Sequence, residues 1–415
     1  MLKKAGTVRQ GHALDIVLAS SIGIAAAVYA LCGFGQLDFV HLASAYDTWF
    51  DADIRRIVGA CEARWTLWHN RTNVHPLYAL LVSLPCMGLR RAGFTQWGAA
   101  AAILSFSAFV FASTFYAVAR VWRLGRVDAV LSTALMLSTS ASMFWLSTPE
   151  TYSLGASTML LALVWLGVRR GAHDRFTAPL QSMLTFSITI TNWMAGLLTA
   201  LLALGLQRAI KVSLIAFVAV AVLSGAQKLI FPQAGLLFQF GEEQIYMLPT
   251  EREPIGTRLL SFFGQPLLAP ETKLLKVHSG TVGVVMESAV PTTPSLFTWV
   301  AFAGWVVLLV IGGLTALQGR APRTLVVFIF TVLASQVALH MLYGSGLFLY
   351  ALHFTPFMVL IASMGSWSPW RKAVLSLTAI TALATSAHNV PQFLSAAENL
   401  RMTSTDSYFV ENFMK

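Results

Sequence analysis

Charged residues are scarce in this chain. They make up 11% of its 415 residues, whereas 56% of the residues are hydrophobic; an average soluble domain has roughly 25% charged residues. This composition excludes a soluble globular protein and indicates a polytopic membrane protein whose first partner is the lipid bilayer. The net charge of +10 is therefore assigned to cytoplasmic loops, which are rich in Lys and Arg in membrane proteins, and not to nucleic-acid binding.

Cysteine and internal repeats are also scarce. Cys32, Cys61 and Cys86 form no C-x-x-C pair and have no zinc-ligand spacing, which argues against a dithiol or zinc motif. Cys61 and Cys86 could pair if both lie outside the cytoplasm. No sequence repeat is visible, and since many secondary transporters consist of two related halves, this disfavours a transporter.

Long apolar runs make up most of the chain. A helix needs about 20 apolar residues to cross the hydrocarbon core. The runs predict an all-α protein with about 11 membrane helices plus interfacial helices, an N-terminus in the cytoplasm and a C-terminus outside it. The helices are predicted near residues 14–35, 98–119, 127–147, 152–168, 178–191, 193–207, 212–231, 295–315, 324–342, 348–367 and 373–390.

The stretch from Thr72 to Pro85 decides the topology. If it crossed the membrane, the later clusters of Arg and Lys would lie outside, against the positive-inside rule. We therefore predict that it enters or lies along the outer leaflet without crossing, with a helix that starts at Pro76. This topology also places nearly all acids outside. The clusters it places in the cytoplasm are Arg120/Arg123/Arg126, Arg169/Arg170/Arg175, Arg208/Lys211, Arg320/Arg323 and Arg371/Lys372.

Two long outer segments interrupt the series of membrane helices. They divide the chain into an N-terminal membrane module at 1–231, which contains a catalytic first outer loop at about 36–97, and a small ordered cap at 232–294. Membrane helices at 295–390 and an outer tail at 391–415 follow. The functional residues are expected in the outer segments, where most of the acids lie.

Acidic residues gather in the first outer segment. Asp47, Asp51 and Asp53 follow the first membrane helix. Asp51 or Asp53 could simply cap a helix that starts there. Three acids together with His69 and His75 exceed what capping needs, so at least one of them is expected to be functional.

The residues after Asp53 have the spacing of an interfacial helix. This spacing predicts that one face of the helix lies against the membrane and that the other faces water. The membrane face would consist of Ile54, Ile57 and Val58, and the water face of Arg55, Arg56 and Glu62.

Glu150 is a second candidate, because it is the only acid in a long apolar stretch. Thr148 and Pro149 before it suit the start of a helix, where an acid is favoured by the helix dipole. An acid at the membrane edge that faces another acidic cluster is also a candidate functional group. Both interpretations remain open.

A third candidate region runs from Tyr343 to Pro356. His353 lies about one helical turn after Tyr350. The imidazole of His353 is either satisfied by packing between helices or binds a ligand, and both interpretations remain open. His340, deep in the preceding predicted helix, is expected to be structural.

Together these features resemble the GT-C membrane glycosyltransferases, and among them the protein O-mannosyltransferase and aminoarabinose-transferase group. The resemblance rests on the acidic segment after the first helix, on H-P-L-Y at 75–78, which is similar to H-P-P-L-Y, and on the acid before the fourth helix. The aromatic turn before a proline-containing late helix also fits. The chain departs from the family where it has F-D-A-D in place of a D-E pair, and P-E-T-Y in place of an acid of the Asp-Pro type.

The resemblance implies a transferase in the bacterial inner membrane. Such enzymes move a sugar from a polyprenyl-phosphate donor to a glycan, lipid or protein of the cell envelope at the periplasmic face, with inversion at the sugar carbon. A base must take the acceptor's hydroxyl proton while cations meet the phosphate. Asp53 or Asp51 would be the base, and Glu150 would position the acceptor. The same three acids would also allow a divalent metal ion to bind.

Further residues are implied as substrate contacts. Neutral side chains would orient the donor or acceptor, and cations would meet the phosphate. The alternative is a transporter or flippase for a lipid-linked or small solute, which would have charges along a central path. A membrane acyltransferase is disfavoured because no H-x-x-x-x-D pair is present. The implied contacts are His75, Tyr152, Tyr350 and His353 on the neutral side, and Arg55, Arg56, Arg252, Arg258, Lys273 and Lys276 on the cationic side.

Overall fold

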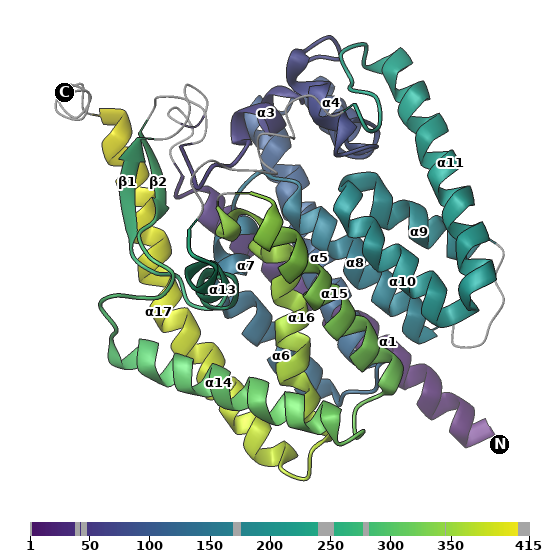
Figure 1. The fold of residues 1–415 in the computed structure, drawn as a ribbon, viewed down its shortest axis with the longest axis vertical. Coiled ribbons are helices and arrows are strands. Elements are labelled where there is room, and N and C mark those ends of the chain that lie inside the picture. Colours follow the sequence, from purple (N-terminus) through teal and green to yellow (C-terminus); the bar gives the residue numbers. More distant parts are fainter. Residues whose placement is uncertain are drawn as a thin grey trace.

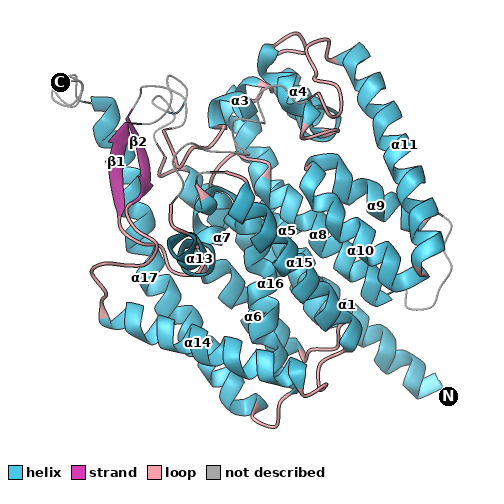
Figure 2. Cartoon of the chain, viewed as in Figure 1, coloured by secondary structure: helices cyan, strands magenta, loops and turns pink. Residues whose placement is uncertain are grey.

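The computed structural model describes the chain except residues 1, 38–41, 43–47, 169–175, 240–252, 277–281, 345 and 406–415. Asp47 and Arg252, both singled out from the sequence, lie outside the described residues. The described part is nearly all helical, with one two-stranded sheet (Figure 2). This confirms the predicted helical class, and the sheet is a feature that the sequence analysis did not predict.

Within the described residues, seven helical segments are long and apolar enough to cross a membrane, which confirms a multi-pass membrane protein. The segment Leu347–Trp367 lies at the centre, since 94% of its most apolar window is buried inside the protein, against 17% for the first segment. The seven segments are α1 (Leu2–Phe34), α5 (Gln96–Val121), α11 (Leu206–Ile230), α14 (Leu296–Leu317), α15 (Arg323–Leu342), η4–α16–η5 (Leu347–Tyr350, Ala351–Ser363, Met364–Trp367) and α17 (Arg371–Thr405).

The other four predicted crossings correspond to shorter helices, so the count of 11 stays a prediction. The run 127–147 is divided at Thr139, whose extended backbone ends one helix and whose Oγ1 accepts the Ser142 N–H at 3.2 Å to begin the next. A short 3-10 turn, η3 (Ile190–Asn192), separates the runs 178–191 and 193–207. The helices are α6 (Arg126–Ser138), α7 (Ser140–Trp145), α8 (Tyr152–Val168), α9 (Thr177–Ile188) and α10 (Trp193–Leu204).

The first outer segment folds into short helices above the membrane bundle (Figure 1). Its short helices are below the length of the candidate crossings, and the membrane position predicted for Thr72–Pro85 stays a prediction. The predicted helix start at Pro76 is wrong: the helical stretch begins at Ala79, because Tyr78 N–H bonds the His75 carbonyl (3.0 Å) and closes a turn there. The short helices are α3 (Ile54–Gly59), η1 (Leu67–Asn73), η2 (Ala79–Ser83) and α4 (Leu84–Arg91).

The second outer segment includes α13 (Ile255–Gly264) and an antiparallel hairpin of β1 (Thr272–Lys276) and β2 (Val282–Met286). Val284 of β2 continues the pairing to the first outer segment. It donates its N–H to the Thr48 carbonyl and accepts from Phe50 N–H, each at 2.9 Å. The hairpin therefore fixes the backbone just before Asp51 and Asp53.

The opposite end of the bundle holds a different set of charges. Asp15 of α1 accepts from Arg120 (3.0 Å) and Arg126 (2.8 Å), and Asp128 of α6 pairs with Arg371 at the start of α17. Helix α5 connects the two ends, since Gln96 at its start bonds the Val58 carbonyl of α3. Its 26 residues span roughly 39 Å, so these ion pairs are remote from the acids of the first outer segment.

Candidate active site

The candidate site begins where α3 meets the turn between α7 and α8. The backbone N–H of Asp53 donates to Glu150 Oε1 at 2.7 Å, and Glu150 Oε2 accepts from Thr151 N–H at 2.8 Å. Glu150 therefore caps α3 from a position 97 residues away in sequence. Asp53 occupies the N-cap position of α3, but its side chain makes no capping bond, so the simple capping interpretation does not explain this carboxylate.

Arg56 holds the Asp53 side chain. Its Nε and Nη2 lie 3.0 and 2.8 Å from Asp53 Oδ2. The prediction that Arg56 faces water is wrong, since the residue is 7% exposed, and its ion pair explains why it turns inward. The predicted apolar face of this helix is buried, and Arg55 lies over the Trp68 ring at 5.6 Å from the ring centre.

The two acids differ in their affinity for a proton. Burial disfavours ionisation of Asp53, but the charges of Arg56 and Arg71 outweigh burial and lower the pKa of its carboxyl below the ordinary value. Burial, and after it the Asp53 charge, raises the pKa of Glu150 to about 7. Since the Asp53 side chain is 41% exposed, the site presents an accessible ionised carboxylate beside a second acid that titrates near neutral pH. Acids with separated pKa values are typical of acid–base sites.

Arg71 is a site residue that the sequence analysis missed. Its charge acts on Asp53, Arg56 and His75. In the sequence it lies between the two candidate histidines His69 and His75. An Arg within a segment already chosen for its acids and histidines was the available signal.

His75 lies where the first outer segment packs against the end of α9. Its Nδ1 is 2.8 Å from the Ile188 carbonyl, and since a carbonyl only accepts, Nδ1 holds the proton. Burial, followed by the charges of Arg56 and Arg71, lowers the pKa of His75 to about 3. The ring is therefore neutral, and its Nε2 is a hydrogen-bond acceptor.

The chain before Asp53 is held in a strained conformation. Phe50 and Asp51 have φ values of 50° and 64°, in the left-handed region that costs about 1–2 kcal/mol per residue for side chains other than glycine. The Phe50 ring contacts Phe144 and Phe348, with ring centres 5.3 and 5.4 Å apart. Together with the backbone bonds to Val284, these contacts hold the turn. Such strain is typical of functional loops.

Three further predicted residues lie together beside the acids. The ring centre of Tyr152 is 6.0 Å from that of Tyr350 and 5.5 Å from that of His353. The charges of Glu150 and Asp53 act on Tyr152. The structure therefore groups residues from α3, α8 and η4–α16 that are up to 300 positions apart, as 53 and 353 are.

Other cations that the resemblance implied as phosphate contacts have contacts away from Asp53 and Glu150. Arg258 of α13 is buried, and its Nη2 donates to the carbonyls of His340, in the last turn of α15, and of Gly344 just after it. Lys273 and Lys276 lie on β1, where both are exposed. The donors that the structure places at the acids are those of Arg56, together with the nearby charge of Arg71.

No group of three or more His, Cys, Asp or Glu residues in the described ranges could hold a metal ion. This includes Asp51, Asp53 and Glu150, which the resemblance offered as metal ligands. Both Glu150 oxygens accept backbone N–H groups and Asp53 Oδ2 accepts from Arg56. These oxygens are therefore engaged within the protein.

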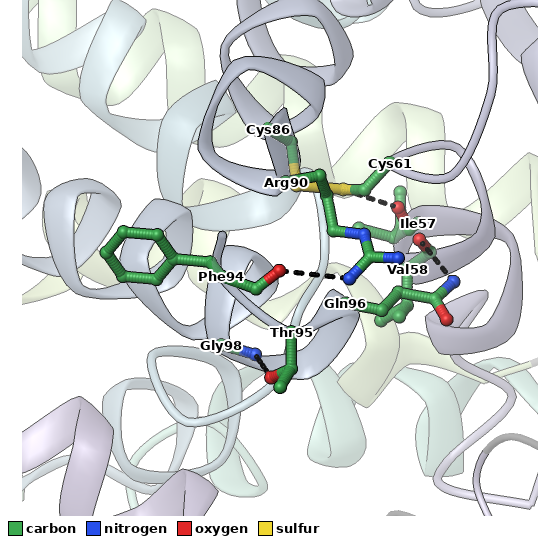
Figure 3. The surroundings of a disulfide bond; sticks show 9 residues. All are labelled: Ile57, Val58, Cys61, Cys86, Arg90, Phe94, Thr95, Gln96 and Gly98. Carbon is green, nitrogen blue, oxygen red and sulfur yellow. Dashed lines mark hydrogen bonds between the residues drawn. A yellow bond between two sulfur atoms is a disulfide. The ribbon is translucent and has the colours of Figure 1, made fainter. Parts of the chain in front are cut away.

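A disulfide joins Cys61, just after α3, to Cys86 of α4 (Figure 3), as the sequence allowed. Gln96 beside it donates to the Val58 carbonyl at 3.2 Å. The disulfide and this bond attach α3, which bears the ion pair, to both α4 and α5.

No protein family, curated protein or solved structure matches this chain.

Proposed function

We propose that this protein is a membrane glycosyltransferase of the GT-C type. It would move a sugar from a polyprenyl-phosphate donor to an acceptor of the cell envelope, at the periplasmic face of the bacterial inner membrane. The observation that supports this most is the accessible, ionised Asp53, held by Arg56 and by the Glu150-capped helix at the end of a membrane bundle. A lipid donor explains why such a site lies beside membrane helices and not in a soluble domain.

Asp53 is the base in the proposed reaction. The acceptor hydroxyl gives its proton to Asp53, and its oxygen forms a bond to the anomeric carbon of the sugar. The bond from that carbon to the phosphate oxygen breaks, the lipid phosphate leaves with the electron pair, and the configuration inverts. Arg56 keeps Asp53 ionised, and Glu150 positions it through the backbone N–H.

The leaving phosphate needs positive charge, because negative charge grows on its bridging oxygen as the bond breaks. Arg71 supplies it in this proposal, since its charge already acts on Asp53 and His75. Arg71 thus takes the part for which the resemblance offered six other cations, which are Arg55, Arg56, Arg252, Arg258, Lys273 and Lys276. His75 Nε2 would accept a hydrogen bond from a hydroxyl group of the sugar or of the acceptor substrate.

Two features support an extracytoplasmic site in a topology with about 11 crossings. The Cys61–Cys86 disulfide lies next to α3, and disulfides persist in oxidising compartments. Arg120, Arg126 and Arg371 lie at the other end of the bundle, where the positive-inside rule expects them on the cytoplasmic side.

The test is sugar transfer by purified protein in lipid nanodiscs, from radiolabelled undecaprenyl-phosphate hexoses to envelope acceptors. We expect Asp53→Asn to lower turnover by about 100-fold or more, the scale of a general base. Glu62→Gln, an exposed acid three residues after the end of α3, is the matched control and should leave turnover unchanged. Equal turnover in Asp53→Asn and wild type would refute the proposed base. If the same protein in closed lipid vesicles moved the intact lipid between the two leaflets without sugar transfer, this would instead indicate a flippase.

A further inference from the structure

A group of polar side chains lies buried beside the candidate site without hydrogen-bond partners. Among the described residues, His353 Nε2 and both polar atoms of Asn192 and of Gln336 have no partner, and neither nitrogen of His340 has one. The four residues are 0–3% exposed. Buried polar groups nearly always have partners in proteins, and lipid offers none. A ligand with polar groups of its own is one way to satisfy them.

Two of these groups converge on one glycine of α8. A methyl group placed on Gly155 would lie 2.8 Å from His353 Nε2, 2.9 Å from Asn192 Nδ2 and 3.5 Å from Thr189 Oγ1. Thr189 in turn lies 3.4 Å from His75 Nδ1. Gly155 therefore lets the imidazole and the amide lie close against the α8 backbone, and a methyl group there would displace both.

Aromatic contacts connect this point to the acids. His353 lies against Tyr152, Tyr152 against Tyr350, and the His340 ring stacks on Tyr350 at 4.8 Å. Tyr152 is two residues from Glu150. The central segment that bears Tyr350 and His353 is almost entirely enclosed by protein, so these groups face other helices and not lipid.

The four side chains named above are amides and imidazoles, whereas the Arg56 and Arg71 charges act on Asp53. Neutral donors and acceptors match hydroxyl groups, and they offer neither a cation for a phosphate nor an anion for an amine. We propose that His353 and Asn192 bind the neutral, hydroxyl-rich sugar of the lipid-linked donor, and that Gly155 is small so that both side chains can hold these positions beside α8. This inference rests on the proposed function and names the substrate class of the same site.

The test measures binding by native mass spectrometry with two probes, undecaprenyl phosphate and undecaprenyl-phosphate glucose. We expect Gly155→Ala to weaken binding of the glucosyl lipid by about 10-fold or more, the effect of losing hydrogen bonds to buried groups. Binding of undecaprenyl phosphate should not change. Gly313→Ala is the control, since a methyl group there meets nothing within 4 Å. His353→Phe keeps the ring shape without its nitrogens and should act as Gly155→Ala does, which covers the case that one variant fails to fold.

The inference would be overturned if Gly155→Ala and His353→Phe weakened the binding of both lipids equally, or weakened the binding of neither. It would also be overturned if the wild-type protein bound the two lipids equally well. A preference for undecaprenyl-phosphate aminoarabinose, which bears a cation, would overturn it too. Failure of the proposed function looks different: wild-type protein then binds the glucosyl lipid selectively but transfers nothing. Normal donor KM in Gly155→Ala and His353→Phe, with turnover lost only in Asp53→Asn, would leave the function standing and remove the sugar site.

Discussion

At the scale of single residues, the site depends on two acids that differ in what surrounds them. Asp53 Oδ2 accepts a hydrogen bond from Arg56, whereas both Glu150 oxygens accept from backbone N–H groups. Glu150 also lies near the negative charge of Asp53. The sequence identified both acids but not their roles. Glu150 was considered as a cap for α8, and the structure makes it the cap of α3, because only the folded chain brings residue 150 to residue 53.

Glu150 should make the protein less stable as the pH rises toward neutral. Its pKa is raised to about 7 in the folded state, against 4.5 for an ordinary Glu carboxyl, so folding takes up a proton between these values. Stability from this group therefore falls as pH rises from about 4.5 to 7 and is flat above that. Thermal unfolding of wild type and Glu150→Gln at pH 5, 6, 7 and 8 checks this. The wild type should lose stability relative to Glu150→Gln across the window, and parallel curves would contradict the assignment.

Removing the Arg71 charge should make Asp53 easier to protonate. An opposite charge nearby lowers the pKa of a carboxyl by about 1–3 units, so Arg71→Gln should move the acid limb of the kcat/KM profile up by about 1 pH unit. Activity at low pH is then lost earlier. Arg55→Gln is the matched control, because Arg55 lies over the Trp68 ring. If both variants shift the limb equally, Arg71 has no special part in the site.

At the scale of helices and strands, apolar length predicted most of the elements. The runs 98–119 and 295–315 became α5 and α14 within a few residues. The break at Thr139 was missed because the apolar run continues through it, although Ser138-Thr139-Ser140 is a capping sequence. The β1–β2 hairpin was missed because 232–294 was assigned only as an ordered cap. The inward turn of Arg56 follows from its ion pair, which helical spacing cannot supply.

Two adjacent glycines of α14 should respond differently to the same substitution. A methyl group on Gly312 would overlap the Ile361 carbonyl oxygen of α16, whereas one on Gly313 meets nothing within 4 Å. Close backbone packing at small residues is typical of membrane helices. Gly312→Ala should therefore destabilise the protein by about 1–3 kcal/mol, and Gly313→Ala should be neutral or slightly stabilising. Thermal unfolding in detergent decides, and equal effects would show that α14 and α16 do not touch there.

At the scale of the whole molecule, the charges are divided between the two ends of the helices. The ion pairs of Asp15 and Asp128 lie at one end of α5 and that of Asp53 at the other. The sequence predicted this division from the positive-inside rule alone, because charge counts do not depend on how helices pack. It could not predict which helix is central, since the enclosed segment Leu347–Trp367 is no more apolar than the exposed α1.

The topology itself predicts opposite accessibility for two exposed positions. Gly88 of α4 lies at the end that bears Asp53, and Gln318 follows α14 next to Arg320, in a cluster that the positive-inside rule assigns to the cytoplasm. In a Cys32→Ser background, Gly88→Cys should react with a membrane-impermeant maleimide in intact cells. Gln318→Cys should react only after the membrane is permeabilised. If Gly88→Cys also needs permeabilisation, Thr72–Pro85 and the Asp53 site face the cytoplasm, and the site has no access to periplasmic acceptors. Labelling of both variants in intact cells would mean that an even number of crossings separates positions 88 and 318, against the odd number predicted.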